Sequence, residues 1–283
     1  RLKLSLRRRL EGNEFMVDEE SPVIMRIRAL VLTAIVILSS ITSVIASDTV
    51  TTQDVEISGN HTMTGNYTVS HGTTLTLKPG ATVDMQDYWM KVDGNLIADN
   101  VTIMSSIQTT GPGSHNAGVW DSLTISSLGT AALDNVTISN AKSCLIVDGL
   151  LQAKHLAVAD CLIGIEVDGS ATIEHFVADD VDIDGVRVTG DADIFDGEMS
   201  DMSGGIHSSG DLVLNDVGFM NTGAGVTLTG GTADLEDLEF LSGVGNAVSI
   251  SAGVSGDIDG MSGTSTNAIV SMDSSGFTIS DID

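Results

Sequence analysis

Three consecutive segments of the chain share one pattern. They read GLLQAKHLAVADCLIGIEVD (149–168), GSATIEHFVADDVDIDGVRVT (169–189) and GDADIFDGEMSDMSGGIHSS (190–209). Each begins at a glycine, and the division continues in both directions, with turn glycines at Gly129, Gly149, Gly169, Gly190, Gly210 and Gly230. The successive spacings are 20, 20, 21, 20 and 20 residues. A fixed period in this range is typical of a repeat architecture.

Apolar residues occupy the same places in every unit when the units are aligned on these glycines. The three main columns are Leu133, Ala153, Ile173, Ile194, Leu214 and Leu235; Val136, Leu156, Phe176, Gly197, Val217 and Leu238; and Ile138, Val158, Ala178, Met199, Phe219 and Phe240. A later pair of columns contains Leu145/Val147, Ile165/Val167, Val186/Val188, Val226/Leu228 and Val248/Ile250. Alternation with polar residues indicates strands with one buried face. A single unit is too small to bury that face, so the units are expected to stack.

About twenty residues with three short strands per unit predict one rung of a parallel β-helix. The fold class is therefore all-β, a right-handed single-stranded parallel β-helix of about nine to ten rungs of 20–22 residues, or about 45 Å of rod. A leucine-rich repeat would need its L-x-x-L-x-L frame and a helical half. A β-sandwich would not hold columns in register over six units.

The pattern extends upstream with one insertion. WMKVDGNLIADNVTI (89–103) matches the repeat, but Gly94 and Gly129 are 35 residues apart, which leaves about 15 extra residues near 105–121. This excess predicts a loop that projects from the side of the rod. VSHGTTLTLKPGATVDM (69–85) continues as strands around a Pro79-Gly80 turn.

The rung pattern resembles the right-handed parallel β-helix repeats of the pectate-lyase-like superfamily, of the secreted or cell-surface type. LTLKPGATVDM (75–85) resembles the entry segment that often precedes such helices in secreted bacterial and archaeal proteins. The resemblance covers about residues 55–283 and implies the fold. It does not imply one function, because the superfamily includes polysaccharide lyases and hydrolases, adhesins and non-catalytic surface proteins.

The first 47 residues are expected to direct export. Met25 begins MRIRALVLTAIVILSSITSVIAS, with basic residues, then an apolar stretch, then small residues typical of a secretory signal. The alternative is an uncleaved membrane anchor over 27–46, which is 20 residues long and contains a single charge at its edge, Arg28. We thus expect three parts: 1–24 as an upstream tail or read-through, 25–47 as a signal peptide or anchor helix, and 48–283 as the β-helix. The chain starts with Arg and ends in SDID partway through a unit, so the domain is expected to be truncated at its C-terminus.

Charge restricts the partners of the exported part. The whole chain has 12 basic and 39 acidic residues, of which five basic and 34 acidic lie after residue 47, a net charge of −29. Such a surface repels nucleic acid and anionic membranes. The favoured explanation of this negative charge is solubility or adaptation to salty surroundings, ahead of a dedicated role in storing cations.

A polar column runs through one turn of the repeat and contains Asn100, Asn135, His155, His175, Asp196, Asp216 and Asp237. Stacked polar side chains at a turn can bond to one another and to the backbone, and this structural role is preferred. A calcium site at Asp196, Asp216 and Asp237 is the sharper alternative, but calcium needs six to eight oxygens, and carboxylates one rung apart are widely spaced. No cofactor is otherwise predicted. His155 and His175 supply only half of a zinc site and are expected to be a structural pair.

No catalytic residue is assigned. Hydrolases of the superfamily that cleave polygalacturonate share Asn-Thr-Asp, Gly-His-Gly and Arg-Ile-Lys motifs, and none occurs here, although Asp179-Asp180 resembles their paired acids. A lyase would need a basic residue, for which only Arg187, Lys142 and Lys154 are candidates. The acidic surface would repel an anionic polysaccharide.

The remaining candidates lie in the insertion, at the cysteines and at sequons. His115, Trp120 and Asp121 are candidate ligand-binding residues because projecting loops often carry function, but a Trp packed against the rod is favoured.

Cys144 and Cys161 are 17 residues apart, and a disulfide and two buried thiols are equally favoured. Glycosylation is predicted as an option at four sequons, Asn60, Asn66, Asn100 and Asn135, the last two of which are favoured as turn residues.

These features predict a non-enzymatic protein outside the cytoplasm, either released or attached to the cell surface. Its role would be structural, adhesive or carbohydrate-contacting, with a polysaccharide or another surface protein as partner and membrane contact only through 27–46. The alternatives are a polysaccharide lyase or hydrolase and a scaffold for protein partners.

Overall fold

The computed structural model describes residues 47–108, 117–273 and 276–282, which belong to one compact unit that begins at Ala46. The predicted signal or anchor at 25–47 lies, except for its last residue, outside the described residues. Every regular element described is a β-strand. Within these three ranges, no helix has the length and apolar character needed to cross a bilayer.

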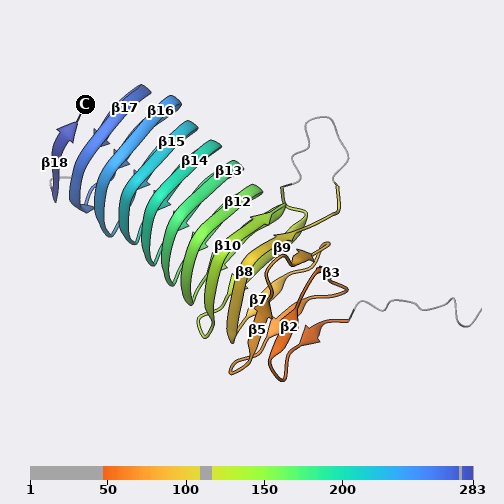
Figure 1. Ribbon diagram of the computed structural model, residues 1–283. Coiled ribbons are helices and arrows are strands. Elements are labelled where there is room, and N and C mark those ends of the chain that lie inside the picture. Colours follow the sequence, from red (N-terminus) through yellow and green to blue (C-terminus); the bar gives the residue numbers. More distant parts are fainter. Residues whose placement is uncertain (1–46, 109–116, 274–275, 283) are drawn as a thin grey trace, which may run out of the picture. The chain divides into compact units, whose positions relative to one another are not determined.

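The chain forms a parallel β-helix of about 10 turns, as the repeat predicts (Figure 1). The short first strands are β1 (Thr49–Val50), β2 (Val55–Ile57), β3 (Asn60–Thr62), β4 (Tyr67–Val69), β5 (Thr74–Leu77), β6 (Thr82–Asp84) and β7 (Met90–Val92). Around the insertion lie β8 (Asn95–Met104), β9 (Trp120–Ile125), β10 (Thr130–Ser139) and β11 (Ala141–Val147). The regular rungs are β12 (Leu150–Val167), β13 (Ser170–Val188), β14 (Asp191–Ser208), β15 (Asp211–Leu228), β16 (Thr232–Ile250), β17 (Ser255–Met272) and β18 (Gly276–Ile282).

Each regular rung has three segments that bend at two corners. In β12 they are residues 150–154, 156–159 and 161–167, here called the first, second and third segments. All pairings between rungs are parallel, and β2, β5 and β8 extend the first segment toward the N-terminus, while β4, β7 and β9 extend the third. The short early strands therefore belong to the same coil as the long later ones.

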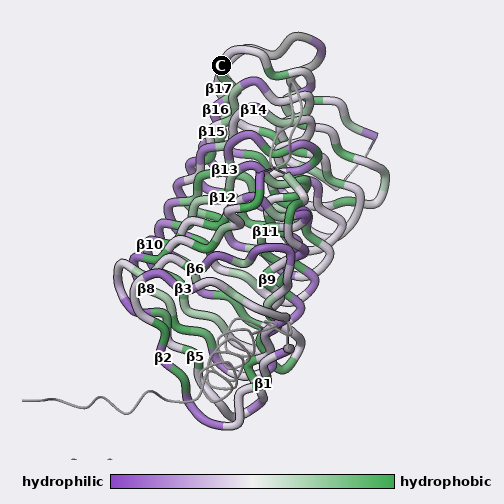
Figure 2. The backbone as a smooth tube through the Cα atoms, turned by 90° about the vertical axis from the view of Figure 1, so that its right-hand side faces the viewer, coloured by the Kyte–Doolittle hydropathy of each residue, from purple (hydrophilic) through white to green (hydrophobic). Residues whose placement is uncertain are grey.

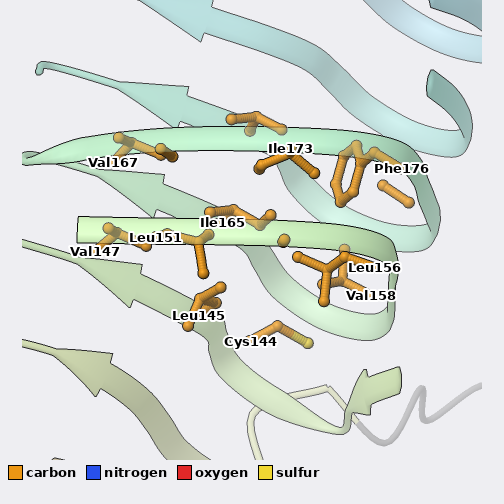
Figure 3. Close-up of a cluster of buried hydrophobic side chains, with 14 of the residues drawn as sticks. Cys144, Leu145, Val147, Leu151, Leu156, Val158, Ile165, Val167, Ile173 and Phe176 are labelled. Carbon is orange, nitrogen blue, oxygen red and sulfur yellow. The ribbon is translucent and has the colours of Figure 1, made fainter. Parts of the chain in front are cut away.

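The predicted columns are confirmed by the register. Ile173 pairs with Ile194, Ile194 with Leu214 and Leu214 with Leu235, and Ala178 pairs with Met199, which pairs with Phe219. Ile173, Ile194 and Leu214 are fully buried. Figure 3 shows buried side chains of successive rungs pointing into the space that the coil encloses. Along the tube of Figure 2, hydrophobic and hydrophilic residues alternate, as a coil with an apolar inside and a polar outside requires.

Both corners are made by single residues in the left-handed conformation. The first corner contains Asn100, Asn135, His155, His175, Asp196, Asp216 and Asp237, all with φ between 51° and 55° except Asp216 at 57°. The second corner contains Asn140, Asp160, Asp180, Asp201 and Asn221. Asn and Asp enter this region more readily than other side chains because their short polar groups bond locally. The polar column of the sequence is thus a column of backbone bends.

The turn glycines allow backbones of successive rungs to approach. A Cβ added to Gly190 would lie 2.1 Å from the carbonyl oxygen of Gly169, and one added to Gly210 would lie 2.0 Å from that of Gly190. The next member of the stack is Gly231, whose added Cβ would lie 2.1 Å from the oxygen of Gly210. The prediction of Gly230 at this place was wrong by one residue, because Leu212 pairs with Ala233, an offset of 21.

One rung has a core position that sequence reasoning missed. Ser208 pairs with Val188 and Leu228, so a serine occupies a place that is apolar in the other rungs. Its side chain is fully buried, and its hydroxyl donates to the carbonyl oxygen of Gly210 at 3.0 Å. The bond satisfies the hydroxyl inside the core, which is how a polar residue is accommodated there.

Candidate functional site

The first corner forms a ladder of side chains on the outside of the coil. The Asn135 amide nitrogen donates to the Asn100 amide oxygen at 3.0 Å. The rings of His155 and His175 stack with centroids 4.6 Å apart. Nδ1 of His155 lies 3.2 Å from Asp134, and Nδ1 of His175 bonds to the Asp196 carboxylate. The ladder therefore links rungs through neighbouring side chains, as expected for the structural role of this column.

Asp196, Asp216 and Asp237 follow one another up the same corner. Phe195 pairs with Asn215 and Asn215 with Glu236, which places these three aspartates on consecutive rungs about 4.8 Å apart. All three are exposed. Among the described residues, no group of three or more His, Cys, Asp or Glu side chains is arranged to hold a metal ion. Calcium binding here stays a prediction.

The second corner carries a similar ladder that sequence reasoning did not identify. Asn221 Nδ2 donates to the carboxylate of Asp201 on the rung below at 3.1 Å. A usable signal was present, because an Asn or Asp follows the first corner by five residues in most units. Polar residues at this spacing mark the two bends that bound the second segment.

The insertion candidates have different surroundings. His115 lies outside the described residues. Trp120 is 1% exposed, and its indole nitrogen donates to the carbonyl oxygen of Ser139 at 2.7 Å. Asp121 is exposed and forms a 2.8 Å ion pair with Lys142. The Trp120 ring is part of the core and has no face free for a ligand, since its neighbours already cover it.

Cys144 and Cys161 are both fully buried, and the structure joins them as a disulfide with Cα atoms 5.9 Å apart. The bond links the third segment of the β11 rung to the start of the third segment of β12. The β11 rung lies directly above β9, where the insertion returns to the coil. A bond here ties the irregular rungs to the regular stack.

The four sequon asparagines are not equivalent. Asn60 is exposed in β3. The side-chain oxygen of Asn66 accepts from the Trp89 amide at 3.3 Å. Asn100 and Asn135 bond to each other in the first corner ladder. Asn60 is therefore the sequon whose side chain has the fewest competing contacts, while glycosylation of any of them stays a prediction.

The first face is acidic. It consists of the outward residues of the first segments from β8 to β17, and its charged members are Asp99, Asp134, Lys154, Glu174, Asp191, Asp193, Asp211, Asp234, Glu236, Asp257 and Asp259. A pocket of about 250 Å³ along this face is lined by Asp191, Asp193, Asp211, Asp234 and Asp257, with Thr232 and apolar neighbours. Hydrogen bonds from the Thr232 hydroxyl and amide lower the pKa of Asp211.

The third face has a different character. It consists of two outward columns of the third segments: Lys91, Thr124, Ile146, Glu166, Arg187, His207, Thr227 and Ser249, and beside them Ser143, Ile163, Asp184, Gly204, Ala224 and Asn246. None of these residues is fully exposed. The face therefore presents side chains that are short or partly covered by their neighbours.

Arg187 is the centre of a polar network on this face. Its Nε and Nη2 donate to Asp184 at 3.1 and 2.7 Å, and Nη1 lies 3.8 Å from Glu166. The Ser143 hydroxyl also donates to Glu166. The guanidinium charge is thus balanced within the face, although 36% of the side chain stays exposed. Lys142 and Lys154, the other basic candidates, pair with Asp121 and Glu174.

The chain has distant structural likenesses among known proteins. No family model matches the chain, and no curated protein matches it. Two structures of PfbA, a surface adhesin of Streptococcus pneumoniae, are similar at 9% identity. The first covers 79% of this chain and 84% of its own with a TM-score of 0.34, and the second covers 81% and 91% with a TM-score of 0.26.

Proposed function

We propose that this chain is an exported, non-enzymatic β-helix protein that acts at the cell surface as a structural or adhesive element. One observation carries the proposal: from β10 to β17 the first and second segments pair from rung to rung without a register shift, and the third segments resume their pairing after shifts near the second corner. The outside of the coil therefore consists of long rows of side chains at a nearly constant spacing. Such rows suit contact with an extended partner, a polysaccharide or a surface protein. The buried Cys144–Cys161 bond supports export, because disulfides persist mainly outside the cytosol.

Surface location is tested on intact cells that produce the chain. Cells are treated with a protease that does not enter them, and the chain is then detected by an antibody in the surface, released and cytoplasmic fractions. Without protease, we expect the β-helix in the surface or released fraction and accessible to the antibody on intact cells. With protease, we expect the surface-bound chain to be degraded while the cells are still intact. A chain found only in the cytoplasm, protected from protease until lysis, would contradict the proposal.

The competing enzyme hypothesis is tested with the purified full chain. Neutral and acidic polysaccharides are incubated with it at pH 5 to 9, with and without millimolar calcium, and new reducing ends and unsaturated products are measured. We expect neither product. Sugar release that disappears in Arg187→Ala would replace the proposal with a lyase or hydrolase, and release that survives this change would place the chemistry elsewhere.

A further inference from the structure

The outward faces of the coil differ sharply in charge. The first face carries ten carboxylates against one lysine, as its charged residues show. The second segments add Asp179, Glu198 and Glu239 with no basic residue among the outward positions that pair from β10 to β16. The third face carries Lys91 and Arg187 against Glu166 and Asp184, so its formal charge is zero. A neutral face on a unit of net charge −29 is the exception that needs an explanation.

The third face is also hydrophilic without being charged along half its length. From β14 to β16 its outward residues are Gly204, His207, Ala224, Thr227, Asn246 and Ser249. No carboxylate interrupts this part, whereas in the same rungs the first face carries five: Asp191, Asp193, Asp211, Asp234 and Glu236. Hydroxyl and amide groups both donate and accept hydrogen bonds, so they match a partner rich in hydroxyl groups.

We propose that the third face is the docking surface for an uncharged polysaccharide, which lies along the stacked third segments from Arg187 toward Ser249. This inference rests on the proposed function and names the chemistry of its partner. A partner that covers the first face must strip water from many carboxylates that share a single lysine, which is costly. On the third face the two carboxylates are already paired with Arg187, so an uncharged partner covers it at a smaller cost.

Charge excludes the other occupants. An anionic polymer is repelled by the unit as a whole, and a cationic partner is drawn to the first face instead. A second copy brings a further charge of −29, and the face offers few large apolar side chains, chiefly Ile146 and Ile163, for a stable dimer core. An uncharged chain of hydroxyl-rich sugar units meets neither obstacle.

The test uses the purified full chain in affinity gel electrophoresis with polymers that differ in charge. Hydroxyethyl cellulose, galactomannan and dextran are the uncharged probes, and carboxymethyl cellulose is the anionic counterpart of the first. We expect at least one uncharged polymer to retard the chain and carboxymethyl cellulose to leave its mobility unchanged. No retardation by any uncharged polymer, or equal retardation by the anionic one, would overturn the proposal.

Variants place the binding on the third face. Thr227→Asp and Ser249→Asp each add a carboxylate there and are expected to weaken retardation at least tenfold. Thr227→Asn introduces a side chain of nearly the same shape as aspartate but without the charge, so this variant should bind as the unaltered chain does. Thr172→Asp adds the same charge to an outward, half-buried position of the first face and should also leave binding intact. Thermal unfolding of each variant confirms that it folds.

The outcomes separate this inference from the proposed function. Retardation that is lost equally in Thr172→Asp, or kept in Thr227→Asp and Ser249→Asp, refutes the third face as the surface while a surface role stands. A cytoplasmic location or release of sugars refutes the proposed function itself. Loss in both third-face carboxylate variants, with Thr227→Asn and Thr172→Asp intact, supports the third face as the docking surface.

Discussion

At the scale of single residues, the corner positions show why a polar column need not be a binding site. Asn100, Asn135, Asp196 and Asp216 are polar because the chain bends there through positive φ. Non-glycine residues in this region cost about 1–2 kcal/mol, and Asn and Asp reduce that cost through local hydrogen bonds. The side-chain bonds between rungs are a second consequence of the same choice.

Backbone strain at the corner predicts an asymmetric response to substitution. Asp216→Ala should lower the free energy of unfolding by about 1–2 kcal/mol because alanine lacks the side-chain bonds that favour the left-handed region. Asp216→Gly should cost less, since glycine enters it freely. Denaturant unfolding measures both changes. Asp234→Ala, at an exposed strand position, is the control, and an equal loss there would contradict the explanation.

A buried hydroxyl predicts a pH dependence. The Ser126 hydroxyl donates to Asp93 at 2.6 Å and lowers the pKa of that carboxyl, with a smaller contribution from Lys91. A lowered folded-state pKa adds stability above the unfolded pKa near 4, and this stability is lost as the pH falls through the folded value. Ser126→Ala should therefore reduce stability by about 1 kcal/mol at pH 7 and much less at pH 2. A loss of equal size at both pH values would contradict this.

At the scale of elements, rung spacing depends on glycine where backbones meet. Gly190→Ala places a methyl group 2.1 Å from the Gly169 oxygen, so the rungs must separate locally. We expect a loss of about 1–3 kcal/mol or more, as for other overpacked sites. Gly218→Ala is the matched control, because its nearest atom, the Gly197 oxygen, is 3.9 Å away. Equal melting temperatures for the two variants would show that the close approach does not matter.

The Cys144–Cys161 disulfide predicts how many thiol labels the unreduced chain takes up and how much stability the chain loses without the bond. Mass analysis of the unreduced, denatured chain should show no thiol label, and two labels after reduction. Closing a loop of this size restricts the unfolded chain, so Cys144→Ala combined with Cys161→Ala should lower stability by about 3 kcal/mol. Labelling of both cysteines without reductant would show that the thiols are free.

The elements also show where sequence reasoning succeeds. The columns through Ile173 and Ile194 were predicted because apolar alternation and unit length are local properties of the chain. Gly231 was missed in favour of Gly230 because a one-residue shift within a longer unit depends on how the rung packs. Ser208 was missed because a polar residue in the core is satisfied only by a backbone oxygen that the fold supplies.

At the scale of the whole molecule, stacking places like charges above one another. Asp196, Asp216 and Asp237 follow at about 4.8 Å, where two exposed carboxylates repel by about 1 kcal/mol in water. The first face repeats this situation along its length. The folded coil therefore concentrates negative charge that the unfolded chain keeps apart, and salt should favour folding by screening it.

The melting temperature should consequently rise as sodium chloride increases from 0.05 to 1 M. Replacing Asp216 and Asp237 together by asparagine keeps the corner conformation and removes two charges, so the variant should melt higher at low salt and gain less from added salt. Calorimetry at several salt concentrations measures both effects. Millimolar calcium chloride, compared with sodium chloride of equal ionic strength, tests the calcium prediction, and no additional shift would rule it out.

The sequence by itself determined that this chain coils in rungs of about twenty residues, which apolar columns are buried, and that the exported part is acidic. These properties follow from the order of residues along one dimension, which a repeat preserves in space. Only the tertiary structure decided that the polar column is a column of bends, that Trp120 belongs to the core, and that Arg187 balances Asp184 and Glu166 on a neutral face. Each of these depends on contacts between rungs, where neighbours in space are about twenty residues apart in the chain.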